Sequence, residues 1–137
     1  VGLAALARWP GRAQLRRARA IDYGQRLQAA CVGLELQQRP ADGAYAAFCV
    51  LLPPGADPAL VAGRLATERI ETRRWYSPPL HLHPAFADAG TAGSLDVTMG
   101  ISSRLLGLPF HLELDARQID RVAQTLARVL GETVEPT

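Results

Sequence analysis

The chain has 137 residues, of which 48% are hydrophobic and 20% charged, and its formal net charge is +2. This size and composition are typical of one globular domain with a modest core. No apolar run approaches the roughly 18 residues of a membrane span and no segment resembles a signal peptide, so we expect a soluble cytoplasmic protein.

The basic residues restrict the chemistry. All 15 are arginine, and the sequence contains no lysine. Arginine stays protonated and cannot act as a nucleophilic amine. An enzyme that needs a lysine Schiff base is therefore not complete within this chain. The chain also begins at Val1, within a helical pattern, which indicates a fragment or an excised domain.

The first thirty residues are predicted to be helical. Residues 1–8 and 12–30 carry apolar side chains at helical spacing, and Trp9-Pro10-Gly11 interrupts the pattern. Six arginines and one acid lie in this region. A nucleic-acid surface would need stacking aromatic residues and Gly-rich loops, which are missing. We therefore favour a solvated face, or one that docks on an absent partner domain.

Two strands follow. Alternating apolar residues predict a strand over 31–37, and residues 39–43 make a turn into a nearly continuous apolar strand over 45–52. The pair is predicted to be an antiparallel hairpin whose second member is more central. Cys31 and Cys49 fall in these strands and are expected to be buried thiols, although a disulfide between them stays open.

The second half of the chain is predicted to contain three helices and one strand. Asp57, followed by proline, begins a helix that runs to residue 68, and residues 70–75 form a third strand. Residues 94–106 contain a helix, and the final helix begins at Asp115 and ends with Gly131 as its C-cap.

This order of elements predicts an α+β fold, with a small antiparallel or mixed sheet of about three strands and helices packed mainly on one face. We expect three parts: a domain-linking helical segment over 1–30, a small domain over 31–131, and a frayed tail over 132–137.

The densest run of aromatic, basic and imidazole groups is Arg73-Arg74-Trp75-Tyr76-Ser77-Pro78-Pro79-Leu80-His81-Leu82-His83-Pro84. Its prolines predict a rigid loop, because proline lacks the amide hydrogen that a helix or central strand needs. Such a loop forms either half of a binding site or a hydrophobic surface loop with incidental histidines.

Two other kinds of site are weaker alternatives. His81, His83 and His111 are metal-ligand types, but no cysteine or carboxylate lies at ligand spacing nearby. A Cys/His hydrolase would need Cys31 or Cys49 to be exposed and activated, and both are predicted to lie in strand cores.

Four groups of residues form an ordered set of motifs over nearly the whole chain. They are Gly2-Leu3-Ala4-Ala5-Leu6; Arg17, Tyr23 and Leu27; Ile70-Glu71-Thr72-Arg73 followed by Tyr76, Pro79, Leu80 and His81; and residues 105–111. Together they resemble the small C-terminal domain of the DegT/StrS family of PLP-dependent aminotransferases. The resemblance implies the small domain of a fold type I PLP enzyme.

The resemblance implies a division of labour. In such enzymes a larger N-terminal domain holds PLP and its lysine, the active site forms at a homodimer interface, and the small domain caps the substrate. The substrate would be a keto sugar, usually nucleotide-linked. By position, Tyr76 and His81 would face the sugar or its amino group, with Trp75 beside them. Arg73 or Arg74 would bind a carboxylate or a phosphate.

The sequence departs from the family pattern at three places. Trp75 stands where many members have histidine, Trp9-Pro10-Gly11 interrupts a usually continuous helix, and Arg69 stands where glycine is common. A family dehydratase, in which histidine replaces the lysine, would resemble this chain equally well. A stand-alone interaction module without catalysis also stays open. An exposed apolar face on the first helix would favour the enzyme, because a missing partner domain leaves its docking surface bare.

Overall fold

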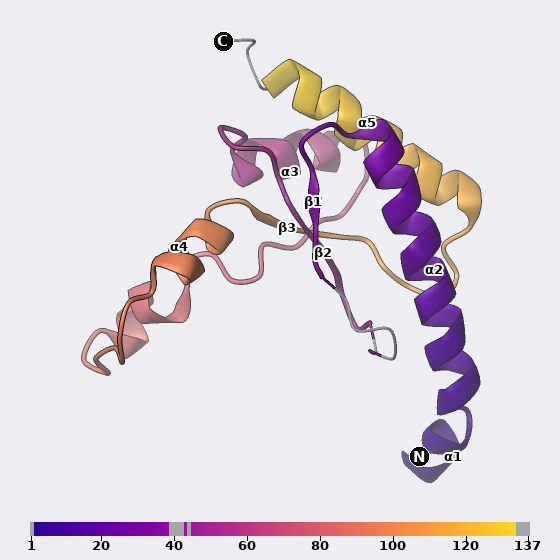
Figure 1. The fold of residues 1–137 in the computed structure, drawn as a ribbon, viewed down its shortest axis with the longest axis horizontal. Helices are drawn as coiled ribbons and strands as arrows, with labels where there is room; N and C mark the ends of the chain where they lie inside the picture. The colour runs from indigo at the N-terminus through magenta and orange to yellow at the C-terminus, as the bar shows by residue number, and fades with distance from the viewer. Residues whose placement is uncertain (1, 39–42, 44, 134–137) are drawn as a thin grey trace.

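The computed structural model describes residues 2–38, 43 and 45–133. Three antiparallel strands form a sheet in the order β1-β2-β3, and three of the helices contain most of the remaining core residues (Figure 1). The elements are α1 Gly2–Ala7, α2 Trp9–Ala30, β1 Glu35–Leu36, β2 Phe48–Leu51, α3 Pro58–Thr67, the 3₁₀ helices η1 Leu80–Leu82 and η2 Pro84–Phe86, α4 Asp96–Ser102, β3 Leu105–Leu108 and α5 Ala116–Thr133. The predicted α+β class and the central position of the second strand are confirmed.

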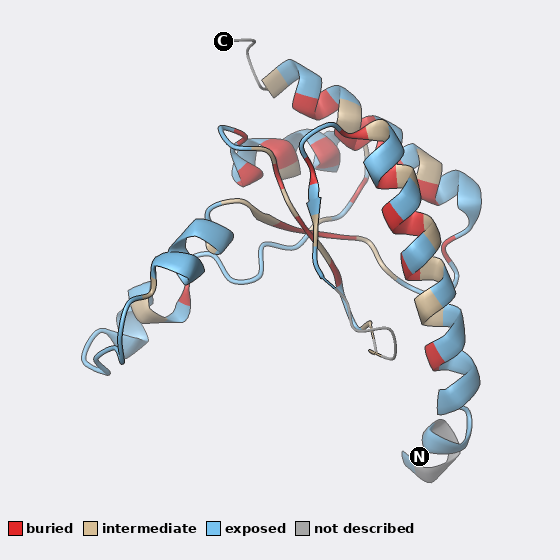
Figure 2. Ribbon diagram, in the orientation of Figure 1, coloured by how far each residue is buried: buried red, intermediate tan, exposed pale blue. Residues whose placement is uncertain are grey.

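The core lies on one face of the sheet. Leu36, Val50 and Leu106 are paired across the three strands, and Phe48 faces Leu108 in the next row. These side chains pack with buried residues of the helices, including Tyr23, Leu27, Val61, Leu65, Ile119 and Leu126. The opposite row, Glu35, Leu51 and Leu105, is partly exposed. Helices therefore cover one face of the sheet, as Figure 2 shows by the concentration of buried residues there.

Two helix starts confirm the predicted caps. The Asp57 carboxylate accepts a hydrogen bond from the amide of Ala59, in the first turn of α3, at 2.7 Å. At α5, Asp115 accepts from the Gln118 amide at 2.8 Å, and the Gln118 side chain accepts from the Asp115 amide at 2.9 Å. This reciprocal pair is a capping box, which satisfies amides that have no partner within the helix.

The predicted third strand over 70–75 is wrong. In that segment Arg73 makes a single bridge to Gly107, and the third strand is β3, Leu105–Leu108. The helix predicted within residues 94–106 is present as α4, which ends at Ser102, ahead of β3. Residues 105–108 pair with β2 as a strand, and this places Leu106 and Leu108 in the core. The packing of these two side chains outweighs the helix propensity of the segment.

Other boundaries also differ from the predictions. The first helix breaks at Arg8, and Pro10 lies in the first turn of α2, where its missing amide hydrogen costs no hydrogen bond. α5 continues through Gly131 to Thr133, so Gly131 is no C-cap; Val129 and Leu130 are buried and hold the last turns. Residues 39–42 of the predicted turn and residues 134–137 of the predicted tail lie outside the described part.

The two predicted strands of the hairpin are shorter than expected. β1 covers two residues and β2 four, so Cys31 lies at the C-terminal end of α2 and Cys49 lies in β2. The two cysteines form no disulfide with each other, which removes that alternative. Cys31 is buried, and its thiol donates to the carbonyl oxygen of Ala123 at 3.6 Å.

The arginines of α2 serve partly to attach this helix to the body. Arg26 bridges Asp22 at 2.8 Å and Asp120 of α5 at 2.5 Å. Arg16 donates to the carbonyl of Tyr45 and lies 5.7 Å from the ring centre of Phe110. These contacts favour a structural use of the basic residues over a nucleic-acid surface.

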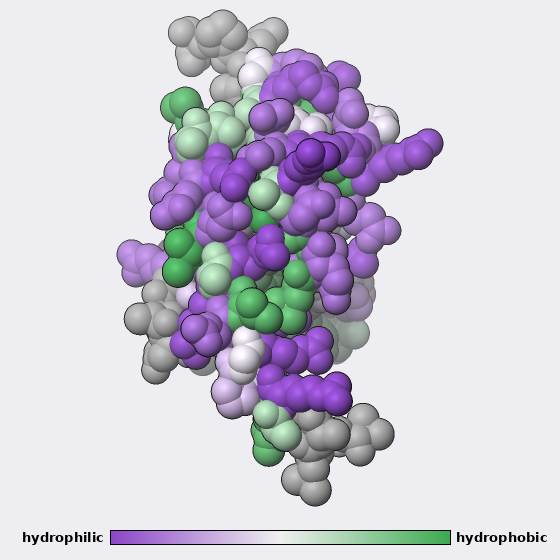
Figure 3. Space-filling model, turned by 90° about the vertical axis from the view of Figure 1, so that its right-hand side faces the viewer, coloured by the Kyte–Doolittle hydropathy of each residue, from purple (hydrophilic) through white to green (hydrophobic). Residues whose placement is uncertain are grey.

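The exposed apolar residues of α2 do not form one face. Trp9, Leu15 and Ile21 are exposed and follow one another at intervals of six residues. Six residues correspond to a rotation of about 600°, so the three side chains point in directions about 120° apart. The side of the molecule on which α2 lies is mainly hydrophilic with separate hydrophobic patches (Figure 3). The observation that would have favoured the enzyme, a single exposed apolar face, is therefore not found on α2.

Residues between Trp75 and Arg104 leave the body as an arm that ends in two 3₁₀ turns and α4 (Figure 1). Most of the arm is exposed, in contrast to the body (Figure 2). Among the described residues, no helix is long and apolar enough to cross a membrane.

Candidate functional site

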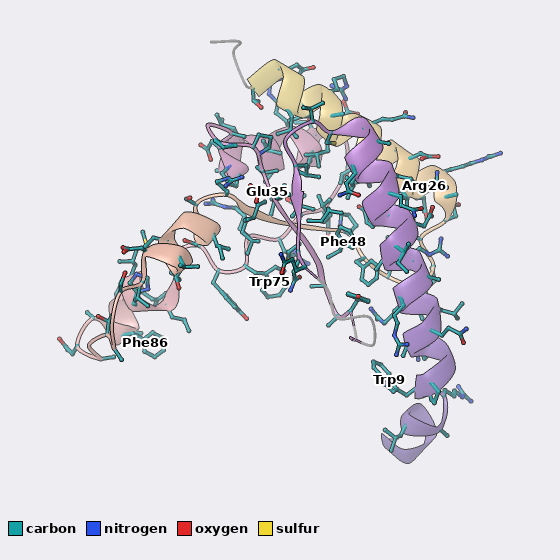
Figure 4. The ribbon with its side chains drawn as sticks, viewed as in Figure 1. Trp9, Arg26, Glu35, Phe48, Trp75 and Phe86 are labelled. Carbon is teal, nitrogen blue, oxygen red and sulfur yellow. The ribbon has the colours of Figure 1, made fainter. Side chains whose placement is uncertain are left out.

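The arm is attached to the body through Arg73 and Gly107. The Arg73 amide donates to the Gly107 carbonyl at 2.9 Å, and the Gly107 amide donates to the Arg73 carbonyl at 2.6 Å. A Cβ atom at Gly107 would lie 3.1 Å from both the Arg73 carbonyl oxygen and Cδ1 of Trp75. The absence of a side chain at Gly107 therefore permits the close approach that places Trp75 beside the sheet (Figure 4).

The predicted loop consists of short turns fixed by local contacts. The peptide bonds Trp75–Tyr76 and Ser77–Pro78 are cis, and Pro79 is buried. The Arg74 guanidinium donates to the Ser77 hydroxyl at 2.7 Å, and η1 and η2 follow. These turns bring the loop opposite α4, which returns the chain to β3.

A groove of about 520 Å³ lies between this loop and α4. Trp75, Tyr76 and His81 line it from the loop side. The facing wall comes mainly from α4 and the start of β3, with Leu95, Val97, Thr98, Ile101, Ser102 and Leu105. The groove thus has largely apolar walls with a phenol and an imidazole among them.

This combination suits a small polar ligand with an apolar side. Tyrosine and neutral histidine each offer one donor and one acceptor, which can orient hydroxyl, amino or carbonyl groups. Binding sites commonly combine apolar lining with a few placed polar groups. Tyr76 is 64% exposed and His81 is half-buried, so both polar groups are accessible from the groove.

The model of the DegT/DnrJ/EryC1/StrS aminotransferase family matches residues 1–127. The chain belongs to this family.

Curated and solved proteins also resemble this chain. The Mycobacterium tuberculosis protein Rv3402c is 38% identical over 79 residues, which are 54% of this chain and 19% of that protein. The aminotransferase TlmJ from Streptoalloteichus hindustanus is 27% identical with a TM-score of 0.76, over 97% of this chain and 35% of TlmJ. DesI, solved in the presence of its TDP-sugar product, is 24% identical with a TM-score of 0.79, over 94% of this chain and 34% of DesI.

The chain therefore spans about a third of the solved neighbours and about a fifth of the curated relative. The fold is that of the small domain of fold type I PLP aminotransferases, as the resemblance implied. The likeness to DesI concerns the fold alone at this level of identity.

The family pattern gives a physical reading of Arg69. Its φ angle is +57°, in the left-handed region that glycine occupies without a steric penalty. The glycine that the resemblance implies at this position would suit this backbone, and this chain places a long basic side chain on it instead. Among the described residues, Arg69 is the one non-glycine residue with positive φ.

The five predicted site residues do not all meet. Trp75, Tyr76 and His81 line the groove, while Arg73 lines a second hollow that shares Trp75 with the groove. Arg74 lines neither of these two hollows and contacts Ser77 instead. The roles of these residues in substrate binding stay predictions, with Arg74 placed less favourably than the others.

The other candidate residues have structural contacts. His83 accepts a hydrogen bond from the Ala85 amide at 3.3 Å and thereby caps η2. His111 lies 3.2 Å from Glu113, and this contact, after a backbone hydrogen bond, helps to lower the pKa of the Glu113 carboxyl. Within the described part of the chain, no three His, Cys, Asp or Glu side chains gather as metal ligands.

Burial argues against a cysteine nucleophile. Burial raises the pKa of the Cys31 thiol from 9.0 to about 11, so the reactive thiolate is scarce near neutral pH. Cys49 is half-buried in the middle of β2. Neither position has the exposed thiol that a hydrolase requires.

Sequence reasoning missed two parts of the site, Gly107 and the α4 wall. The signal for Gly107 was a glycine within an apolar run, which in a strand often marks a close approach of another backbone. The α4 wall could not be recognised because the approach of residues 95–102 to the loop depends on where β3 pairs.

Proposed function

We propose that this chain is the substrate-capping part of a PLP-dependent aminotransferase that transfers an amino group to a keto sugar. The groove between the loop and α4 holds the sugar, which in this proposal is linked to a nucleotide. The observation that supports it best is that Tyr76 and His81, two positions of the family motif, line one groove of about 520 Å³.

The cofactor is held outside this chain in the proposed enzyme. The sequence contains no lysine, so the group that anchors PLP comes from a larger domain beyond residues 1–137. When bound there, PLP acts as an electron sink for the transfer of the amino group. The proposed partners are that PLP domain and a second copy of the enzyme, and the proposed compartment is the cytoplasm.

The residues of this chain bind and orient the substrate. The Tyr76 hydroxyl donates to or accepts from a sugar oxygen, and the His81 imidazole positions the carbonyl or amino group that faces the cofactor. The apolar side chains of α4 pack against the face of the sugar that makes no hydrogen bond to Tyr76 or His81, and they exclude water from it. A fixed orientation of this kind accelerates transfer because the reacting atoms already lie near each other.

The experiment is a pair of substitutions in the polypeptide that carries both this chain and the PLP domain. We expect Tyr76→Phe and His81→Ala each to lower kcat/KM about tenfold or more, since each removes a hydrogen bond to the substrate worth about 1.5 kcal/mol. Both side chains are accessible, so the melting temperature is expected to stay nearly unchanged.

His83→Ala is the matched control. His83 is exposed and lines neither the groove nor the second hollow, so its removal is expected to leave kcat/KM for the sugar within about twofold. Parallel loss of activity and stability in Tyr76→Phe and His81→Ala would assign these residues a structural role. Full activity in both variants would contradict a substrate site in the groove.

A further inference from the structure

A third hollow, of about 440 Å³, lies between α2 and β1, the edge strand of the sheet. One wall is a single face of α2 that runs from Arg17 to Gln28 at steps of three and four residues. Leu36, Gln37 and Tyr45 form the facing wall. The helix wall is about 16 Å long, which is the length of about five residues of extended chain.

The outer edge of β1 has open backbone groups. Within the described chain, β1 pairs with β2 on one side and with no strand on the other. The amide of Leu52 donates to the carbonyl oxygen of Arg104 on the β3 side, so the backbone groups of Leu51 point the other way, towards β1. Their partner Glu35 faces β2, and the N–H and C=O of Leu36 therefore point to the outer edge. An open edge of this kind is a template for a further strand.

Arg17 is the charged residue of the third hollow. Its Nε atom is buried and has no hydrogen-bond partner in the structure. The neighbouring Arg16 differs, because it donates to the carbonyl oxygen of Tyr45 at 2.8 Å. The described lining contains no carboxylate, and its other side chains are apolar, amide or phenol groups. A buried charged donor without an acceptor is unfavourable, so Arg17 indicates an acceptor that comes from outside the described chain.

The other polar groups of the third hollow suit a polypeptide backbone. Three exposed glutamines line it, namely Gln25, Gln28 and Gln37. Each amide offers donors and an acceptor, the two kinds of group that an extended chain presents along its length. Ile21 is 61% exposed on the same face of α2 and offers an apolar contact. A free anion of a few atoms would use Arg17 and leave the backbone of Leu36 unpaired, whereas a peptide that carries a carboxylate uses both.

We propose that the third hollow binds an extended peptide segment that carries an aspartate or a glutamate and joins the sheet as a strand beside β1. The segment exchanges backbone hydrogen bonds with Leu36. Its carboxylate accepts from the guanidinium of Arg17, whose parallel N–H donors match the two carboxylate oxygens. In this mode of recognition the main chain supplies affinity and the side-chain contacts supply specificity.

The segment belongs to the polypeptide outside residues 1–137. β1 is two residues long, so pairing along its edge together with one ion pair gives little affinity for a separate protein. A tethered segment binds at an effective concentration on the order of millimolar and needs no more affinity than this. The chain spans 35% of TlmJ and 34% of DesI, which leaves most of each neighbour outside the matched part. The inference rests on the proposed function in one respect, that a larger domain accompanies this chain.

A photoreactive side chain in the third hollow identifies the occupant. In the polypeptide that carries this chain, benzoylphenylalanine in place of Gln28 is expected to cross-link to a peptide outside residues 1–137 that contains aspartate or glutamate. Gln124 is the matched control position, because it is an exposed glutamine of α5 that lines neither the groove nor either hollow. Benzoylphenylalanine there is expected to give no cross-link to that peptide. A cross-link from position 28 to residues 1–137 of a second copy or to another protein, or no cross-link, overturns the proposal.

Hydrogen exchange measures the contribution of Arg17. We expect the amide of Leu36 to exchange slowly in the same polypeptide and Arg17→Gln to raise its rate about tenfold, typical of a lost charged hydrogen bond. Arg12→Gln removes the same charge from an exposed position of α2 outside the third hollow, and is expected to change the rate less than about twofold. The amide of Val50, in the central strand, is expected to exchange equally slowly in all three proteins. Equal rates at Leu36 in the two variants, or a rise shared by Val50, overturns the role of Arg17.

Failure of this proposal is distinguishable from failure of the proposed function. The PLP content and the amino transfer of the same preparation report the enzyme. An active enzyme that gives no cross-link from position 28 and exchanges the Leu36 amide rapidly overturns the bound segment alone. A polypeptide without a domain beyond residues 1–137 overturns both proposals.

Discussion

Replacement of Gly107 by alanine tests how the arm is held against the body. The new Cβ atom would lie 3.1 Å from the Arg73 carbonyl oxygen and 3.1 Å from Cδ1 of Trp75. Ordinary contacts between such atoms are about 3.5–4.0 Å, so the 73–75 segment must move by roughly half an ångström. The same carbonyl accepts the Gly107 amide at 2.6 Å, so this movement stretches the hydrogen bond that fixes the segment.

Two opposing effects set the magnitude. Overpacking at a tight contact costs about 1–3 kcal/mol, and the reduced entropy of the unfolded chain returns about 0.4–1 kcal/mol for glycine to alanine. We therefore expect Gly107→Ala to lower the free energy of unfolding by about 1–2 kcal/mol. We also expect Trp75 to become more accessible to a quencher, because the segment that carries it is displaced.

Both effects are measured in a Trp9→Phe background, in which Trp75 is the one remaining tryptophan. Urea denaturation followed by circular dichroism gives the free energy of unfolding, and acrylamide quenching of the fluorescence gives the accessibility of Trp75. Gly63→Ala is the matched control, since Gly63 lies within α3 and its Cβ would meet nothing within 4 Å. That variant is expected to stabilise the protein by about 0.5–1 kcal/mol. A Gly107→Ala protein as stable as the parent, with unchanged quenching of Trp75, would refute the role assigned to this glycine.

Three further predictions concern the core and a helix cap. Because the pKa of Cys31 rises from 9.0 to about 11, the folded state keeps the thiol proton while the unfolded chain loses it, so stability should fall as the pH rises above about 9. Urea denaturation at pH 9 and at pH 10 should show the free energy of unfolding falling by at most about 1.4 kcal/mol per pH unit, and this fall should be absent in Cys31→Ala. The buried hydroxyl of Tyr23 has no hydrogen-bond partner among the described residues, so thermal unfolding should show Tyr23→Phe to be no less stable than the parent. Asp115→Ala should lower the free energy of unfolding measured by urea denaturation by about 1 kcal/mol. Asp115→Asn should lower it much less, because asparagine can also accept the hydrogen bond from the Gln118 amide; equal losses in the two variants would contradict the capping role.

Local signals in the sequence predicted some elements well. The caps at Asp57 and Asp115 depend on side chains within three residues of the amides they satisfy, so the pattern contains the whole interaction. The apolar stripe of the last helix likewise predicted its buried face, including Ile119 and Leu126. In both cases the information is contained within one or two turns of helix.

The third strand could not be recognised in the same way. Residues 105–108 and 70–75 are both short segments that a strand could occupy, and what distinguishes them is that residues 105–108 pair with β2, more than fifty residues away in the sequence. Once Leu106 and Leu108 occupy the core, the 70–75 segment is left with one bridge at Arg73. The sequence order therefore indicated three strands but assigned the third to the wrong segment.

The grouping of the loop residues could be predicted in part because the loop carries a family motif, while their role in substrate binding stays a prediction. Tyr76, His81 and Trp75 lie together as that motif suggested, whereas Arg73 and Arg74 point to different surroundings. The opposite wall depends on the path of α4, and the backbone angle of Arg69 has no local sequence signal apart from the family glycine. These features arise from tertiary structure rather than from neighbouring residues.

The most direct test of the account is the mass and cofactor content of the native polypeptide that contains this chain. Because the chain covers 34% of a solved neighbour such as DesI, we expect a product about three times heavier than 14.7 kDa, purified from its source cells with an antibody against this domain. It should carry PLP that borohydride fixes to a lysine outside residues 1–137. A product near 14.7 kDa that binds no PLP would contradict the assignment of this chain as the substrate-capping part of an aminotransferase.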